Sequence, residues 1–176
     1  RDPRNVVTSI SNHYTLSLDE SLKFMLSDTI IGNKKSFEES LKEKRSGILT
    51  LLGKWNLHYR SWTRKKENLL LIRYEDLILN PQFELEKISL FLNKYIKFKT
   101  NKIKNENIIK TTSFENLKKM ENKEPFKEGV LNKETKSKVN FFNLGPKNKW
   151  ENTLDKNIVR KIEENFNNEM REIGYL

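Results

Sequence analysis

Two arginines and two hydroxyl residues near the start of the chain have the types and the spacing to bind a phosphate. Arg1 and Arg4 carry charged donors that suit phosphate oxygens, and Thr8 and Ser9 add short hydroxyl donors further along. If these residues share a helix, its amino end contributes free N–H groups and partial positive charge. The sequence therefore predicts a phosphate-binding helix terminus within residues 1–14. The alternative is a well-capped amphipathic helix with no ligand.

The residues between these candidates predict that helix. Asp2 can cap it, and Pro3 suits its first position because proline has no N–H to leave unpaired. Apolar residues then recur at helical spacing, at Val6, Val7, Ile10 and Tyr14.

Tyr74 is a second candidate because of where it stands. It ends an apolar run, Leu69–Ile72, that is typical of a strand covered on both faces in a parallel sheet. Open α/β sheets bind ligands at the carboxyl ends of their strands. Asn80 and Pro81 then turn the chain into a predicted amphipathic helix. A half-buried tyrosine at a strand end, without a ligand, is the alternative.

Residues 1–9 resemble the 3′-phosphate-binding segment of the sulfotransferases that use 3′-phosphoadenosine 5′-phosphosulfate (PAPS). The resemblance continues along the chain in the family's order. Its further segments are Gly53-Lys54-Trp55 with His58 and Trp62, then Tyr74-Glu75-Asp76, Thr112-Ser113-Phe114, and a loop from Phe141 to Trp150.

The resemblance implies roles for six of these residues. It assigns the 3′-phosphate to Arg1 and Ser9, and it brings Tyr74 close to the adenine. The hydroxyls and the stacking ring that would enclose the adenine belong to Thr112, Ser113 and Phe114.

The last segment departs from the family pattern. Asn143 and Leu144 stand where relatives carry an Arg-Lys pair that contacts the 3′-phosphate, whereas Gly145 matches. Such charge-assisted bonds contribute about 1.5–3 kcal/mol each. We therefore keep Asn143, Leu144 and Gly145 as candidate PAPS-contacting positions. Either Lys147 or Lys149 restores part of the charge, or the affinity for PAPS is weaker.

The resemblance also implies the reaction and the limits of this chain. PAPS is the co-substrate, no metal is required, and a sulfuryl group passes to an acceptor hydroxyl or amine on a small molecule, a carbohydrate or a lipid. The family's phosphosulfate loop and its catalytic base have no counterpart in the sequence. We expect residues 1–176 to be a single domain, the carboxyl-terminal part of a sulfotransferase domain, holding the 3′-phosphate and adenine half of the site and inactive alone.

The expected fold class is α/β, a three-layer parallel sheet of P-loop type that is incomplete and rich in helices. Further helices are predicted over 16–26 and 48–66, the latter with the aromatic side chains of Trp55, Tyr59 and Trp62 in the core. Residues 36–45 are predicted to form an exposed helix or a mobile excursion. His58 is interpreted as structural. One closing helix carries an apolar stripe from Ile158 to Ile173 and ends at a Gly174 cap.

Composition narrows the remaining choices. The 176 residues hold 33% charged and 35% hydrophobic residues with a net charge of +10, so an anionic partner is favoured. No apolar run approaches the roughly 20 residues of a membrane span, and the absence of cysteine favours the cytoplasm. The alternative functions are a basic nucleic-acid-binding or scaffolding module and a small-molecule kinase of P-loop ancestry. We favour neither, and expect no nucleic-acid partner.

Overall fold

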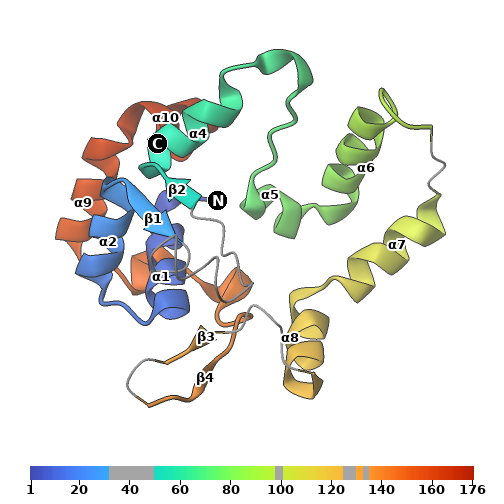
Figure 1. The fold of residues 1–176 in the computed structure, drawn as a ribbon. Helices are drawn as coiled ribbons and strands as arrows, with labels where there is room; N and C mark the ends of the chain where they lie inside the picture. Colours follow the sequence, from blue (N-terminus) through green and yellow to red (C-terminus); the bar gives the residue numbers. More distant parts are fainter. Residues whose placement is uncertain (32–49, 98–100, 125–129, 133–134) are drawn as a thin grey trace, which may run out of the picture.

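The computed structural model describes residues 1–31, 50–97, 101–124, 130–132 and 135–176. Figure 1 shows a cluster of helices on one side and an arc of helices, α5 to α8, on the other. The elements, in chain order, are α1 Pro3–Tyr14, α2 Leu18–Leu26, β1 Thr29–Ile31, β2 Thr50–Leu52, α4 Trp55–Thr63, η1 Lys66–Asn68, α5 Tyr74–Leu79, α6 Pro81–Leu92, α7 Lys102–Thr111, α8 Phe114–Lys123, β3 Val130–Leu131, β4 Lys138–Val139, η2 Gly145–Lys147, η3 Trp150–Asn152, α9 Lys156–Asn165 and α10 Asn167–Ile173.

The first helix begins where its predicted cap places it, and the helix predicted over 16–26 begins at Leu18. The Asp2 carboxylate accepts a hydrogen bond from the Arg4 backbone N–H at 2.8 Å, directly before Pro3. Ser17 and Glu20 form a reciprocal capping box at the start of α2. Both starts depend on neighbours within three residues, so the sequence pattern is sufficient to locate them.

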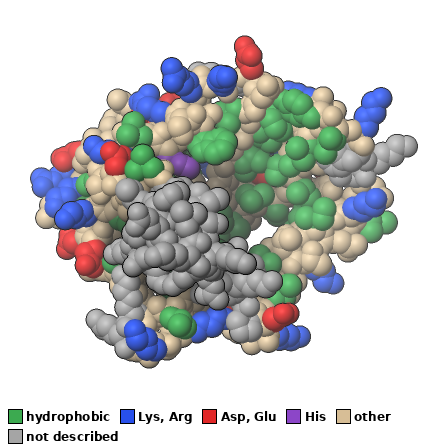
Figure 2. Space-filling model, viewed as in Figure 1, with side chains coloured by type: hydrophobic (Ala, Val, Ile, Leu, Met, Phe, Trp, Pro, Cys, Tyr) green, Lys and Arg blue, Asp and Glu red, His purple; other side chains and the backbone are tan. Residues whose placement is uncertain are grey.

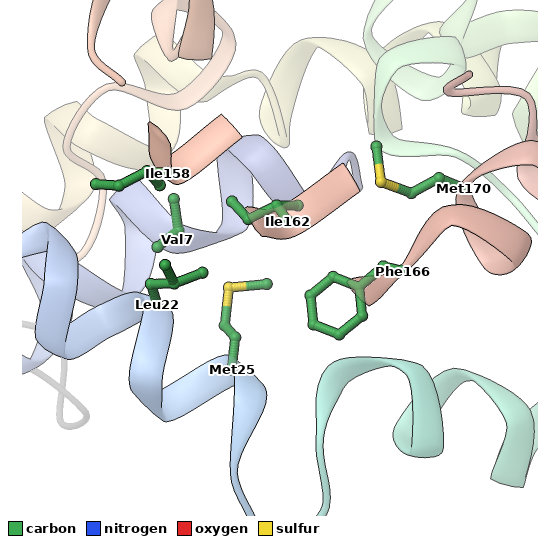
Figure 3. Packing of buried hydrophobic residues seen from close by; sticks show 7 residues of the cluster. All are labelled: Val7, Leu22, Met25, Ile158, Ile162, Phe166 and Met170. Atoms are coloured by element: carbon green, nitrogen blue, oxygen red, sulfur yellow. The ribbon is translucent and has the colours of Figure 1, made fainter. Parts of the chain in front are cut away.

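The hydrophobic core lies among α1, α2, α9 and α10. Seven buried apolar side chains pack together there, and Figure 3 shows them converging from helices at both ends of the chain. They are Val7, Leu22, Met25, Ile158, Ile162, Phe166 and Met170. This core fixes the position of α1, the helix that carries the predicted phosphate ligands.

The arc is built differently. The main contacts of α6 are with α5 and α7, and those of α8 are with α7, so the helices follow one another around a curve (Figure 1). The described residues of these helices add no apolar side chain to the buried core. The arc therefore depends on contacts between consecutive helices.

The predicted strand at 69–73 is not assigned as one. The backbone is extended at Leu69 and Arg73, but no strand pairs with this segment among the described residues. The described strands form two antiparallel pairs, β1 with β2 and β3 with β4. A strand needs a hydrogen-bonded neighbour, so an apolar pattern alone does not produce one. The structure is helix-rich with few strands, and the three-layer parallel sheet is not confirmed.

Three details of the helix predictions were wrong. The helix predicted over 48–66 begins only at Trp55, because Thr50–Leu52 pairs with β1 as strand β2. Trp55 packs against Phe166, with ring centroids 5.1 Å apart, but Trp62 is 67% exposed because α4 meets the core near its first residue. The closing helix is two helices, α9 and α10, separated at Phe166, although Gly174 does cap the second in the left-handed conformation. The exposed helix or excursion predicted over 36–45 lies outside the described residues. No helix that the structure describes is both long and apolar enough to span a membrane.

Candidate functional site

A cleft of about 870 Å³ lies between α1, the arc and the loop that leads into η2. In Figure 2 the surface is hollowed between the core helices and the arc, and hydrophobic side chains gather on the arc side. All nine residues proposed from the resemblance to contact PAPS line this cleft: Arg1, Ser9, Tyr74, Thr112, Ser113, Phe114, Asn143, Leu144 and Gly145. Segments that are far apart in the chain therefore share one concave surface.

Arg1 links two walls of the cleft. Its guanidinium donates a hydrogen bond to the Gly145 carbonyl oxygen at 2.8 Å and lies 4.4 Å from the centroid of the Tyr74 ring. Its Nε is buried and has no hydrogen-bond partner among the described residues. Since a buried donor without a partner is costly, this atom is suited to an anionic ligand.

Arg4, the other arginine of the predicted phosphate helix, is occupied elsewhere. It is buried, pairs with Asp2 at 2.7 Å and lies 4.1 Å from the centroid of the Trp150 ring. Burial alone would lower the pKa of Arg4, but its hydrogen bonds to Asp2 and Glu163 outweigh burial and raise that pKa. Arg4 therefore has a structural role, because it holds Trp150 at the end of the late loop, residues Phe141 to Trp150.

Ser9 is positioned by a residue that the sequence reasoning missed. The amide of Asn148 is buried and donates to the Asn5 carbonyl oxygen at 3.0 Å and to Ser9 Oγ at 3.4 Å. Its side-chain oxygen accepts from the Thr8 hydroxyl at 2.9 Å. Asn148 is not among the residues that the sequence pattern assigned to the site. In the structure it ties the late loop to α1.

Thr112 and Ser113 sit at the junction of two arc helices. Thr112 ends α7 and donates its hydroxyl to the Ile108 carbonyl oxygen at 2.7 Å. Ser113 caps α8, accepting from the Asn116 N–H at 3.4 Å. The two hydroxyls therefore have structural partners, and the junction turns Phe114 toward the cleft.

The Phe114 ring packs directly against Gly145 and leaves no room for a side chain at that position. Gly145 has a φ of +54°, which L side chains rarely adopt, and a Cβ at this position would overlap the Phe114 ring. The ring also contacts that of Phe142 edge-on, with centroids 6.2 Å apart. The matched glycine of the family pattern thus lets the late loop approach the ring.

Each residue of the Tyr74-Glu75-Asp76 segment contacts a different side chain: Tyr74 contacts Arg1, Glu75 contacts Tyr175 and Asp76 contacts Arg73. Burial raises the pKa of the Tyr74 hydroxyl, and the nearby Arg1 only partly opposes this shift, so the phenol stays neutral. Glu75 accepts a hydrogen bond from the Tyr175 hydroxyl at 2.8 Å. Asp76 forms a paired contact with Arg73, with the two bonds at 2.7 and 2.8 Å. The segment therefore connects the cleft to the carboxyl end of the chain.

A second residue missed in the sequence holds the late loop to α8. Glu121 is buried, and its two carboxylate oxygens accept the backbone N–H groups of Phe141 at 2.7 Å and Phe142 at 3.0 Å. A buried carboxylate needs such partners. In the sequence Glu121 is one of many charged residues in a basic stretch, and no local signal distinguishes it.

Asn143 and Leu144 line the cleft but supply no charge. Neither Lys147 nor Lys149 is among the described residues that line it, and both are exposed. The ammonium of Lys118, on α8, donates to the Asn143 carbonyl oxygen at 3.3 Å. Among the described residues, no group of three or more His, Cys, Asp or Glu side chains is placed to hold a metal ion.

Curated relatives match different shares of the chain. Sulfotransferase 1B1 of Canis lupus familiaris is 37% identical over 47% of this chain and 27% of its own length. Sulfotransferase 1 family member D1 of Mus musculus is 30% identical over 78% of this chain and 45% of its own length. The 3-alpha-hydroxysteroid sulfotransferase of Cavia porcellus is 36% identical over 40% of this chain and 24% of its own length. The matches thus span less than half the length of each of these relatives.

No solved structure matches the chain with significance. The protein-family model of the sulfotransferase domain, however, matches residues 1–174, which is nearly the whole chain. The matched range includes every residue of the cleft named above. This chain belongs to the PAPS-dependent sulfotransferase family.

Proposed function

We propose that the cleft binds PAPS and its product, adenosine 3′,5′-bisphosphate, and that the whole protein transfers a sulfuryl group from PAPS to an acceptor. The observation that carries the proposal is the convergence of Arg1, Ser9, Tyr74 and Phe114 on one cleft. These residues come from α1, α5 and α8, so the convergence is a property of the folded chain.

The chemistry of the cleft walls fits such a nucleotide. The Phe114 ring and the apolar side chain of Leu117 offer surfaces for the adenine. Arg1, with its unpartnered Nε, offers a donor for the 3′-phosphate. The Ser9 hydroxyl donates to the Asn5 carbonyl oxygen at 3.2 Å and would rotate to donate to the phosphate instead. A ligand with a flat base and an anionic ribose phosphate therefore meets suitable groups on both sides.

The transfer reaction is proposed for the whole protein, and nucleotide binding for this chain. In the reaction the acceptor oxygen or nitrogen attacks sulfur and gives its proton to a general base of the whole protein. The bond between sulfur and the phosphate oxygen breaks, and the bisphosphate leaves. We also propose that residues 1–176 form the carboxyl-terminal part of a sulfotransferase domain. In that domain Leu69–Arg73 would become a strand of a parallel sheet, because the backbone is already extended at both ends of this segment.

The acceptor is proposed to be a hydroxyl or amine on a small molecule, a carbohydrate or a lipid. The cytoplasm is the proposed compartment, since a chain without cysteine gains nothing from an oxidising one. Although Trp62 is exposed, Trp55 and Tyr59 are partly buried against each other and Phe166, so these rings do not form the open stacking platform of a nucleic-acid-binding protein.

Ligand binding by this chain tests the nucleotide assignment. Thermal-shift and calorimetric titrations should show binding of adenosine 3′,5′-bisphosphate in preference to ATP and to a single-stranded oligonucleotide. Phe114→Ala should weaken bisphosphate binding about tenfold or more, since stacking on a base contributes about 1–3 kcal/mol. Phe83→Ala, at an exposed phenylalanine of α6, is the matched control and should bind as the parent does. A preference for the oligonucleotide would contradict the proposal.

Group transfer needs a second experiment. This chain and a version extended at its amino terminus would each be incubated with radiolabelled PAPS and a panel of alcohols and amines. Labelled product is expected from the extended version alone. Turnover by residues 1–176 would contradict the division of the site between the two parts.

A further inference from the structure

Two cations contact the same short segment at the rim of the cleft. Arg1 donates to the carbonyl oxygen of Gly145 at 2.8 Å, and Lys118 donates to the carbonyl oxygen of Asn143 at 3.3 Å. The two acceptors are separated in sequence by Leu144 alone. An anion bound beside this segment would therefore lie within reach of both side chains.

The cleft itself has little positive charge. Among the described residues that line it, Arg1 is the only lysine or arginine, and Glu115 contributes a carboxylate. A nucleoside bisphosphate carries several negative charges, and one guanidinium neutralises only one of them. A second cation close to the rim would lower this electrostatic cost.

Lys118 has donors to spare. It forms no ion pair among the described residues, and the Asn143 carbonyl occupies one of the three N–H bonds of its ammonium. Its Nζ lies 5.8 Å from the centroid of the Phe114 ring, which lines the cleft. The flexible stem of a lysine lets such an ammonium turn toward a phosphate without moving the helix.

We propose that Lys118 is the second phosphate-binding cation of this cleft and that it supplies, from α8, charge that Asn143 and Leu144 lack. The inference rests on the proposed function, because it concerns the same nucleotide. It assigns the phosphate contact to a helix of the arc, whereas the sequence directs attention to the lysines that follow Gly145. The bound 3′-phosphate would accept hydrogen bonds from Lys118 and from Arg1.

The test compares two ligands and three variants. Adenosine 3′,5′-bisphosphate and adenosine 5′-monophosphate, which lacks the 3′-phosphate, are titrated calorimetrically into the parent chain, Lys118→Gln, Lys118→Arg and Lys119→Gln. Neither Lys118 nor Lys119 is among the described residues that line the cleft, but only Lys118 has a hydrogen bond to the segment at its rim. Lys119 is an exposed neighbour on the same helix, so Lys119→Gln matches the change in net charge. Thermal unfolding of each protein reports whether the fold is retained.

Lys118→Gln is expected to weaken binding of the bisphosphate about tenfold and to change binding of the monophosphate less than twofold. Lys118→Arg should keep most of the affinity, and Lys119→Gln should resemble the parent. If the parent binds the bisphosphate, any of three results would overturn the assignment. These are an equal loss of affinity for both ligands in Lys118→Gln, no loss of affinity for the bisphosphate in Lys118→Gln, and a loss of affinity in Lys119→Gln as large as that in Lys118→Gln. A parent that does not bind the bisphosphate would instead overturn the proposed function.

Discussion

The core helices and the arc face each other across the cleft, but their interiors differ. The core buries seven apolar side chains from α1, α2, α9 and the start of α10. In the described arc helices the buried residues are polar, namely Glu84, Ser89, Asn105 and Glu121. Large apolar side chains of the arc are exposed instead, among them Leu79, Phe83, Leu90 and Ile103.

This difference separates the two halves of the proposed nucleotide site. Arg1 and Ser9 lie on or next to α1, which the core holds in place. Phe114 and Lys118 lie on α8, which adds no side chain to the buried apolar core among the described residues. Segments with little apolar burial open at lower cost than the core of a protein. We therefore expect the core side of the cleft, with Arg1 and Ser9, to be rigid and the arc side, with Phe114 and Lys118, to depend on polar contacts.

Those polar contacts come from the late loop. Glu121 receives the N–H groups of Phe141 and Phe142 on the arc side, while Asn148 bonds to Asn5 and Thr8 on the core side. The loop thus joins two regions that share no apolar core among the described residues. Both residues are buried, so each has a large cost if its partners are lost.

The largest expected effect compares apolar burial in the two regions. Phe166→Ala removes a side chain that is 1% exposed and should lower the free energy of unfolding by about 3–5 kcal/mol. Phe83→Ala, at a side chain that is 61% exposed, should lower it by less than about 1 kcal/mol. Urea denaturation followed by tryptophan fluorescence measures both. Similar losses at the two positions would end the distinction between core and arc.

The next effect concerns the loop that joins the regions. Asn148→Ala removes the hydrogen bonds that the side chain makes with the Asn5 carbonyl oxygen and the Thr8 hydroxyl, and at about 1 kcal/mol each this should lower the free energy of unfolding by about 2 kcal/mol. Asn143→Ala, at an exposed asparagine of the same loop, is the control and should cost less than about 0.5 kcal/mol. Equal costs would show that Asn148 does not join the loop to α1.

Gly145→Ala should act mainly on the ligand. The added Cβ would overlap Phe114 and needs a positive φ, so the ring or the loop must move. We expect affinity for adenosine 3′,5′-bisphosphate to fall about tenfold, which corresponds to about 1.4 kcal/mol. Gly53→Ala lies outside the cleft and should leave affinity unchanged. Parent-like affinity in Gly145→Ala would show that Phe114 is not held by this contact.

The smallest effect depends on pH. Hydrogen bonds from Arg73 hold the pKa of Asp76 below its usual value, so the native state favours the ionised carboxylate more than the unfolded chain does. The resulting stability is fully present above the unfolded pKa of about 3.9 and is lost as the pH falls through the lower native value. Asp76→Asn should therefore be less stable than the parent at pH 7 and nearly equal to it at pH 2.

A matched comparison isolates the pair. In an Arg73→Gln background, Asp76→Asn should change the free energy of unfolding by the same amount at pH 7 and at pH 2, because the partner that shifts the pKa of Asp76 is gone. A difference that persists without Arg73 would assign the pH effect to another group. Since Arg73 also donates to the Gly174 carbonyl oxygen at 3.3 Å, this pair reports on the contact between α5 and the carboxyl end.

Local signals in the sequence determined the helix starts at Asp2 and Ser17 and the cap at Gly174, because such signals act between residues a few positions apart. The order of short motifs determined the family and named residues that share a cleft. Only the tertiary structure decided that Trp62 is exposed and that Leu69–Arg73 has no strand partner among the described residues. It also decided that Asn148 joins the late loop to α1 and that Glu121 and Lys118 contact this loop from α8. These outcomes depend on groups brought together from distant parts of the chain, and no periodicity or spacing records which partners will be there.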